Sequence, residues 1–235
     1  MGSSPTAILI FSVSASAEAA RKAKTFREKP GVARRIADAL IANTLREARL
    51  SGLPVVMIPE GQQRGATFGE RLTHAFQSTF RLGYQRVMAI GNDCPSLTAA
   101  NLRQAALALE SNGLVIGPAS DGGAYLIGMD RTCFDPVRLS ALAWQESHLC
   151  RDLIHYSAAF RRGVTLLQQL DDIDDRRALL AIARSCRKEK LCRHILNLIG
   201  KTPDHPVRDD VPFASPFVTR CANLRSPPLP LPAFC

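Results

Sequence analysis

Residues 86–98 read RVMAIGNDCPSLT and hold the clearest succession of strand, loop and helix in the chain. The run 86–90 is short and largely apolar, as expected of a strand buried in a sheet. A polar turn follows, and Thr98 stands where its hydroxyl can cap a helix that continues to about residue 111. Such a succession is typical of an α/β protein with a parallel sheet. Asp93 then falls at the carboxyl end of the strand, where open α/β sheets bind ligands.

The same alternation continues on both sides of this stretch. Upstream, the apolar patterns predict strands at 7–13 and 54–58 and a helix at 33–50. Thr67 and Glu70 have the spacing of a capping box, which predicts the start of a further helix that stops at Gly83. Downstream, they predict strands at 114–116, 124–129 and 164–167, a helix at 146–159, and two helices that end near residue 199. We therefore expect residues 1–200 to form one α/β domain with three layers, α/β/α, around a mostly parallel Rossmann-like sheet.

The last part of the chain has a different composition. Residues 201–235 carry eight of the 15 prolines. Because proline removes a backbone donor and fixes φ, so dense a set disfavours both helices and strands. We predict that residues 201–235 form an extended or disordered tail outside the domain.

The net charge of +9 comes mainly from one segment, 176–201, which holds eight lysines and arginines against Glu189 alone. Three tyrosines and one tryptophan offer no aromatic platform for bases, so nucleic acid is disfavoured as a partner. We interpret the segment as a solvated basic helix face. A weaker alternative is contact with an anionic membrane surface or RNA, because an apolar stripe accompanies the charges at Leu191, Ile195, Leu198 and Ile199.

The patterns of cysteine, histidine and apolar residues indicate the cellular compartment in which the protein is expected. The seven cysteines form no CxxC pair, and the five histidines form no HExxH motif, so neither a disulfide framework nor a zinc site is predicted. The longest apolar runs are too short to cross a bilayer. We expect a soluble, cytoplasmic protein with reduced thiols.

Two acidic features suggest chemistry, and each has a plainer interpretation. The carboxylate of Asp93 suits Mg²⁺, which needs only one or two protein carboxylates when phosphates complete its shell. The local sequence is equally compatible with a polar turn of Asn92, Asp93 and Ser96. The run 171–175 holds four aspartates, and such a run is usually the solvated start of a helix.

A glycine-bearing loop and two cations complete the set. Residues 117–123 read GPASDGG, where adjacent glycines let the backbone approach a ligand or simply form a hairpin turn. Lys24 and Arg71 lie near predicted carboxyl-edge loops, where they could meet phosphates, although single cations are more often surface charges.

Taken together and in order, these motifs resemble those of a bacterial family of GT-A-like glycosyltransferases, the radical-SAM/selenodomain-associated transferase type. The resemblance covers about residues 6–185 and is carried by TFGERL (67–72), GNDCPSLT (91–98), GPASDGGAYLIG (117–128), Trp144 and DID (172–174). More distantly, the chain is similar to small nucleotidyltransferases. The resemblance implies the nucleotide-diphosphosugar transferase fold.

The resemblance also implies roles for single residues. Asp93 takes the place of the metal-binding acidic residue for Mg²⁺ or Mn²⁺, and Asp174 completes the metal site. Phosphate or nucleotide contacts are expected from Lys24, Arg71 and Asn92. On the acceptor side, Asp121 is a further catalytic candidate, in a loop that the family pattern lines with Gly122, Gly123, Tyr125 and Trp144.

Three functions follow as hypotheses. The first is a metal-dependent transferase that passes sugar from a nucleoside diphosphosugar to a small-molecule or lipid-linked acceptor. The second is a nucleotidyltransferase that joins an NTP to a phosphorylated small molecule and releases pyrophosphate. The third is a non-catalytic module that binds a nucleotide.

Overall fold

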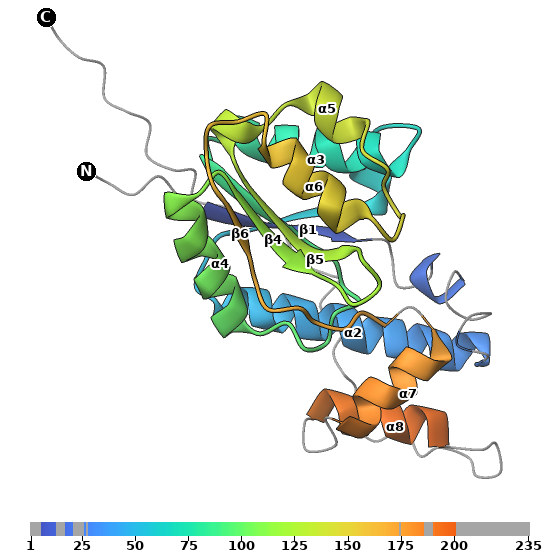
Figure 1. Ribbon diagram of the computed structural model, residues 1–235. Helices are drawn as coiled ribbons and strands as arrows, with labels where there is room; N and C mark the ends of the chain where they lie inside the picture. The colour runs from blue at the N-terminus through green and yellow to red at the C-terminus, as the bar shows by residue number, and fades with distance from the viewer. Residues whose placement is uncertain are drawn as a thin grey trace, which may run out of the picture. The chain divides into compact units, whose positions relative to one another are not determined.

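A six-stranded sheet lies at the centre of the computed structural model, with the order β2-β1-β3-β5-β4-β6 (Figure 1). Its strands are β1 (Thr6–Ser12), β2 (Val55–Pro59), β3 (Arg86–Ile90), β4 (Leu114–Pro118), β5 (Ala124–Asp130) and β6 (Val164–Leu166). The structure describes residues 6–12, 17–20, 26, 28–173, 175–185 and 190–200. The predicted tail, 201–235, lies outside this range and stays a prediction.

The direction of one strand differs from the rest. β1 pairs in parallel with β2 and β3, and β4 pairs in parallel with β6, whereas β5 runs antiparallel to both β3 and β4. The reason is the short loop between β4 and β5, because only antiparallel neighbours can be joined by so few residues. The prediction of a mostly parallel sheet is confirmed.

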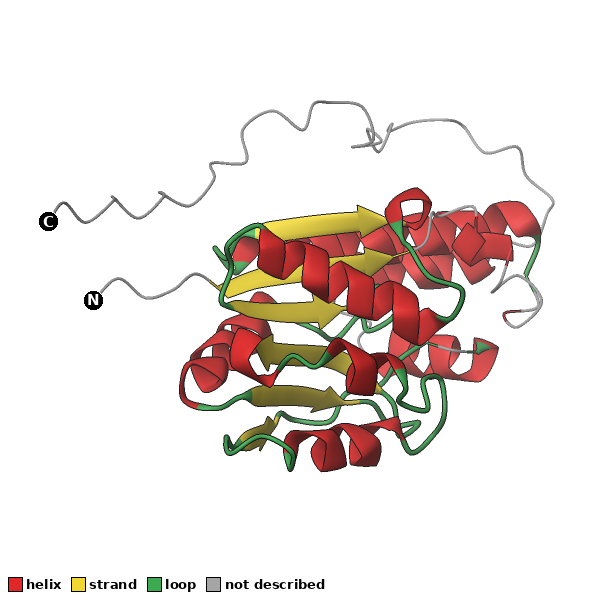
Figure 2. Ribbon diagram, turned by 90° about the horizontal axis from the view of Figure 1, so that it is seen from above, coloured by secondary structure: helices red, strands yellow, loops and turns green. Residues whose placement is uncertain are grey.

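Helices cover both faces of the sheet and complete the three predicted layers (Figures 1 and 2). One face packs against α3 (Phe68–Arg81), α5 (Pro136–Ser140) and α6 (Leu149–Ser157). The other packs against α2 (Pro30–Leu50) and α4 (Ala99–Ser111). Within β1, Leu9 faces the first layer and Ile8 the second, so the strand is buried on both faces and its residues 7–11 are all apolar.

Sequence patterns placed the long helices well and missed a short one. The predicted helix at 146–159 is observed as α6, which is shorter, and the single-turn α5 precedes it. Asp135 caps α5 by accepting hydrogen bonds from the N–H groups of Val137 and Arg138, and Pro136 occupies its first turn. Asp-Pro is a recognised helix start, but five residues carry too little periodicity to reveal a helix.

The capping box predicted at Thr67 is present and starts α3 at the carboxyl edge of the sheet. The Glu70 N–H donates to the Thr67 hydroxyl (3.1 Å), and the Glu70 carboxylate accepts from the N–H groups of Thr67 (3.4 Å) and Ala66 (2.6 Å). These bonds satisfy backbone donors that the first helical turn leaves without partners.

Removal of this cap should weaken the fold measurably. We expect Thr67→Ala to lower the free energy of unfolding by about 1 kcal/mol, the usual cost of losing a hydroxyl cap. Chemical denaturation with urea measures the change, and Thr67→Ser, which keeps the hydroxyl, is the matched control. Equal stability of Thr67→Ala and the parent protein would contradict the assigned role.

The last two described helices, α7 (Arg176–Ser185) and α8 (Lys190–Gly200), form a third apolar cluster with α2. Ile195 and Leu198 on α8 are buried in this cluster, and Leu191 and Ile199 pack against it. The apolar stripe that suggested membrane contact is therefore turned into the protein. Contact with an anionic surface would rest on the charged side chains of these helices.

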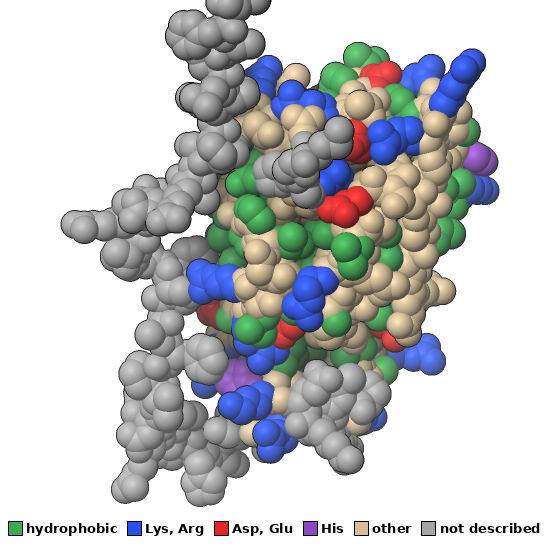
Figure 3. Space-filling model, turned by 90° about the vertical axis from the view of Figure 1, so that its left-hand side faces the viewer, with side chains coloured by type: hydrophobic (Ala, Val, Ile, Leu, Met, Phe, Trp, Pro, Cys, Tyr) green, Lys and Arg blue, Asp and Glu red, His purple; other side chains and the backbone are tan. Residues whose placement is uncertain are grey.

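Those charged side chains are exposed. Arg184, Lys190 and Arg193 face solvent, and Arg176 lies 3.4 Å from the carboxylate of Glu28. On the face in Figure 3, Lys and Arg side chains are interspersed with hydrophobic and acidic ones. Among the described helices, none is long and apolar enough to cross a membrane.

Candidate active site at the carboxyl edge of the sheet

The parallel strands bring three loops to one edge of the sheet. β3 leads into Asn92 and Asp93, β4 leads into the loop 119–123, and β6 leads into the segment 167–173. Because β1, β2, β3, β4 and β6 share one direction, their carboxyl ends meet at this edge. This is the position at which open α/β sheets bind ligands.

Backbone hydrogen bonds tie the segment after β6 to the other two loops. Leu170 donates to Pro118 (3.1 Å) and accepts from Ser120 (3.1 Å), which extends the pairing of β4 and β6. Further along, the N–H of Ile173 donates to the backbone oxygen of Asp93 (2.8 Å). The residues before Ile173 are thereby brought beside the β3 loop.

The carboxylate pair of this edge, Asp93 and Asp172, acts on one buried thiol, that of Cys94. Burial raises the pKa of the Cys94 thiol far above its usual value, and the charge of Asp172 and a hydrogen bond from the thiol to that carboxylate act in the same direction. The charge of Asp93 adds to this effect. Asp93 and Asp172 therefore both lie close enough to Cys94 to influence its proton.

The glycine before Asn92 makes room for the first of these carboxylates. A Cβ atom at Gly91 would stand 2.8 Å from Oδ1 of Asp93, closer than real Cβ atoms approach other atoms. The Asp93 side chain therefore folds back over the backbone of Gly91. Only glycine leaves the Asp93 carboxylate this position.

The donor set suits a hard divalent cation that shares its shell with a substrate. Two carboxylates are enough for Mg²⁺ or Mn²⁺ when phosphate oxygens and water complete the coordination. Among the described residues, no set of three or more His, Cys, Asp or Glu side chains is placed to hold a metal ion. Asp174, predicted to complete the metal site, lies outside the described residues, so its role stays a prediction. The neighbouring Asp172 is brought beside the β3 loop by the hydrogen bond from Ile173 to Asp93.

The Asp121 loop is an ordered turn. The Gly123 N–H donates to Oδ1 of Asp121 (2.8 Å), while the side chain of Asp121 remains exposed at the site edge. Gly122 has a φ of +91°, and a Cβ atom there would overlap the carbonyl oxygen of Ser147. The Gly122 carbonyl accepts from the N–H of Cys150 (3.1 Å), so this loop is fastened to the start of α6.

Tyr125 and Trp144, predicted on the acceptor side, both hydrogen-bond to backbone oxygens of the protein. The Tyr125 hydroxyl donates to the backbone oxygen of Gln168 (2.8 Å), and burial raises its pKa to about 12, with Cys94 and Asp172 contributing. The indole N–H of Trp144 donates to the backbone oxygen of Leu139 (2.9 Å).

The Trp144 ring also lies against the start of α3. A Cβ atom at Gly69 would run into Trp144, and the rings of Phe68 and Trp144 are 5.6 Å apart. Tyr125 and Trp144 are thus both engaged with the protein itself, Tyr125 with the segment after β6 and Trp144 with α3 and α5, and their predicted place on the acceptor side stays a prediction.

Of the three residues predicted to contact phosphate, the structure describes two, Arg71 and Asn92. Arg71 lies early in α3 and donates from Nη1 to the backbone oxygen of Ala66 (3.1 Å). Asn92 is buried beside Asp93, and its Nδ2 meets no acceptor within the described part of the chain. Lys24 lies outside the described residues, so its role stays a prediction.

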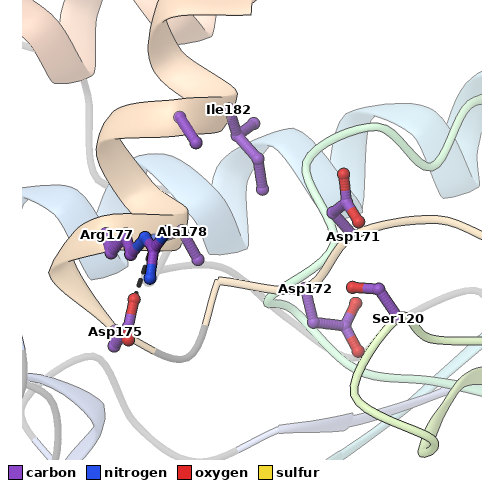
Figure 4. Close-up of a pocket in the computed structure, with 8 residues that line it drawn as sticks. Ser120, Asp171, Asp172, Asp175, Arg177, Ala178 and Ile182 are labelled. Carbon is purple, nitrogen blue, oxygen red and sulfur yellow. Dashed lines mark hydrogen bonds between the residues drawn. The ribbon is translucent and has the colours of Figure 1, made fainter.

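Sequence reasoning missed a cleft beside the carboxylate pair. A cavity of about 350 Å³ lies between the loops and α7 (Figure 4), and its lining residues are Ser120, Asp171, Asp172, Asp175, Arg177, Ala178, Ala181 and Ile182. The acidic run 171–175 pointed to this region. Nothing in the linear pattern indicated that α7 would face Ser120 across it.

Comparison with known families now places the chain. A family model described as "Uncharacterized protein conserved in bacteria (DUF2064)" matches residues 27–144, half of the chain. The chain belongs to this family. A comparison with the curated proteins finds no match. The more specific resemblance to the radical-SAM/selenodomain-associated type stays a prediction.

Solved structures establish the fold of this family member. A crystal structure of a "putative nucleotide-diphospho-sugar transferase" from Desulfovibrio desulfuricans G20 matches with a TM-score of 0.73 and 22% identity, over 83% of this chain and 96% of that one. The family member therefore has the fold of the nucleotide-diphosphosugar transferases, as predicted.

Two further matches are weaker. Rv0371c from Mycobacterium tuberculosis H37Rv, in complex with manganese, has a TM-score of 0.42 and 17% identity over 78% of this chain and 100% of that one. The mannosyltransferase PcManGT from Pyrobaculum calidifontis, in complex with GDP-Man and Mn²⁺, has a TM-score of 0.39 and 12% identity over 83% and 68%. TM-scores this low do not establish a shared fold.

Proposed function

We propose that this protein is a metal-dependent glycosyltransferase that uses a nucleoside diphosphosugar and transfers the sugar to an acceptor hydroxyl. The observation that carries the proposal is the pair Asp93 and Asp172, brought together at the carboxyl edge of a sheet with the nucleotide-diphosphosugar transferase fold.

The reaction requires charge neutralisation more than a protein nucleophile. The acceptor oxygen attacks the anomeric carbon, the bond from that carbon to the diphosphate oxygen breaks, and the hydroxyl proton leaves to a nearby base or water. A Mg²⁺ or Mn²⁺ ion held by Asp93 and Asp172 would neutralise charge that develops on the leaving diphosphate. The chain's own task is to hold donor and acceptor in line.

Three features of the chain serve this positioning. Asn92 directly precedes Asp93, and its buried Nδ2, which meets no acceptor among the described residues, is the donor that we assign to the diphosphate. The loop around Gly122, which accepts a hydrogen bond from Cys150 at the start of α6, keeps Asp121 at the edge of the site. The start of α3 contributes Arg71, whose guanidinium retains further donors beyond its bond to Ala66 and suits a phosphate oxygen.

Thermal unfolding with a panel of nucleotides tests the proposal directly. With Mn²⁺ present, we expect one nucleoside diphosphosugar at a hundred times its Kd to raise Tm by roughly 5–10 °C, since binding to the native state alone adds about 2.7 kcal/mol. The shift should vanish when EDTA removes the metal.

The same panel separates the other two hypotheses. A shift confined to one nucleoside triphosphate, with pyrophosphate released when acceptors are added, would replace the proposal with a nucleotidyltransferase. Nucleotide binding that does not depend on metal would indicate the non-catalytic module.

A further inference from the structure

We propose that the cleft between α7 and the site loops is the acceptor subsite, and that it takes a neutral polyhydroxylated molecule such as a sugar ring or cyclic polyol. This inference rests on the proposed function and adds the class of acceptor. It also assigns recognition to α7, which lies outside the part of the chain matched by the family model.

The position of the cleft makes it part of the reaction site. Asp172 directly precedes Ile173, whose N–H donates to the backbone oxygen of Asp93 (2.8 Å), and Asp172 also lines the cleft. A molecule in the cleft therefore lies beside the place where the donor diphosphate would be held. An acceptor must approach the anomeric carbon within a few ångströms of that group, and this cleft borders it.

The two walls of the cleft have different chemistry (Figure 4). The α7 wall presents Ala178, Ala181 and Ile182, and the two alanines leave the space open. The opposite wall presents Ser120, with Asp171 and Asp172. Sugar rings and cyclic polyols have matching faces, because their C–H groups pack on apolar side chains while their hydroxyls donate to carboxylates.

The charges of the lining discriminate between ligand classes. Asp171, Asp172 and Asp175 face the cleft with Arg177 as the single cation among the lining residues. One Asp175 oxygen accepts from the N–H of Ala178 (2.7 Å) at the start of α7, so this carboxylate is already held by the helix. Because Asp172 is assigned to the metal ion, Asp171 supplies the negative charge of the opposite wall, which disfavours phosphorylated acceptors, and its carboxylate oxygens accept from hydroxyl donors.

Ligand-observed NMR on the full chain tests this assignment. In saturation-transfer experiments with Mg²⁺, we expect myo-inositol and methyl α-D-mannopyranoside to bind, and glycerol 3-phosphate not to bind. Ala181→Leu, which fills the cleft from α7, and Asp171→Asn, which removes an acceptor of hydroxyl donors, should each raise Kd at least about tenfold.

Matched substitutions control for charge and bulk. Ala100→Leu on the exposed face of α4 and Asp38→Asn on the exposed face of α2 repeat the two changes away from the cleft and should leave Kd unchanged. Both cleft variants should keep the Tm shift produced by the nucleoside diphosphosugar, because they alter the acceptor side.

Each failure has its own signature. Absence of polyol binding, or equal Kd values for the parent protein and Ala181→Leu, overturns the subsite. Binding of spermidine in place of the polyols overturns the ligand class. A third outcome separates the two proposals: polyols bind in a way that depends on Ala181 and Asp171, but no nucleoside diphosphosugar shifts Tm. That result would support the polyol site in the cleft and contradict the glycosyltransferase proposal.

Discussion

Asp93→Asn should lower the rate of sugar transfer by about 10²- to 10³-fold or more, the range seen when one electrostatic contact to developing charge is removed. The substitution keeps the size of the side chain and removes its negative charge. The fold should survive, because Asp93 lies in a loop and its backbone oxygen still accepts from Ile173. The effect should therefore appear in kcat and in metal binding rather than in stability.

Two measurements check this expectation. A radiolabelled sugar transfer assay gives the rate, and the Mn²⁺-dependent Tm shift reports metal binding without turnover. Asp38→Asn removes the same charge from the exposed face of α2 and is the matched control. Unchanged turnover and unchanged Mn²⁺ binding in Asp93→Asn would contradict the assignment of Asp93 as a metal ligand.

Gly122→Ala should be the most damaging small substitution in the site loops, at a cost of at least about 2 kcal/mol in the free energy of unfolding. Gly122 has a φ of +91°, which side-chain-bearing residues rarely adopt, and the new Cβ would overlap the backbone of Ser147. Backbone atoms cannot move aside as the end of a flexible side chain can. The loop must therefore separate from the start of α6.

Urea denaturation measures the loss of stability that this separation causes, and the transfer assay measures its effect on activity. Loss of the contact between Gly122 and Cys150 should displace Asp121 and lower transfer, even where the protein remains folded. Gly61→Ala is the control, because a Cβ atom there meets no heavy atom within 4 Å and the backbone φ is ordinary. A Gly122→Ala protein as stable and active as Gly61→Ala would show that the loop tolerates the side chain.

The sequence alone determined the six strands, the long helices and one end of the site. The strands were predicted because apolar periodicity is local, and the start of α3 because the Thr67 and Glu70 spacing specifies a capping box. Asp93 was placed at the carboxyl edge because it directly follows a buried strand. None of these inferences needs to know which strands are neighbours.

Only the tertiary structure decided the partners across the site. The order β3-β5-β4-β6 brings the segment before Ile173 next to Asp93 and so places Asp172 beside the β3 loop. Sequence reasoning had not assigned Asp172 to the metal site, for which the resemblance implied Asp174. The same arrangement sets α7 opposite Ser120 and creates the cleft. The physical reason is that strand order and helix placement depend on packing between distant segments. The entropy of closing long loops varies only slowly with their length, so local sequence cannot select one neighbour over another.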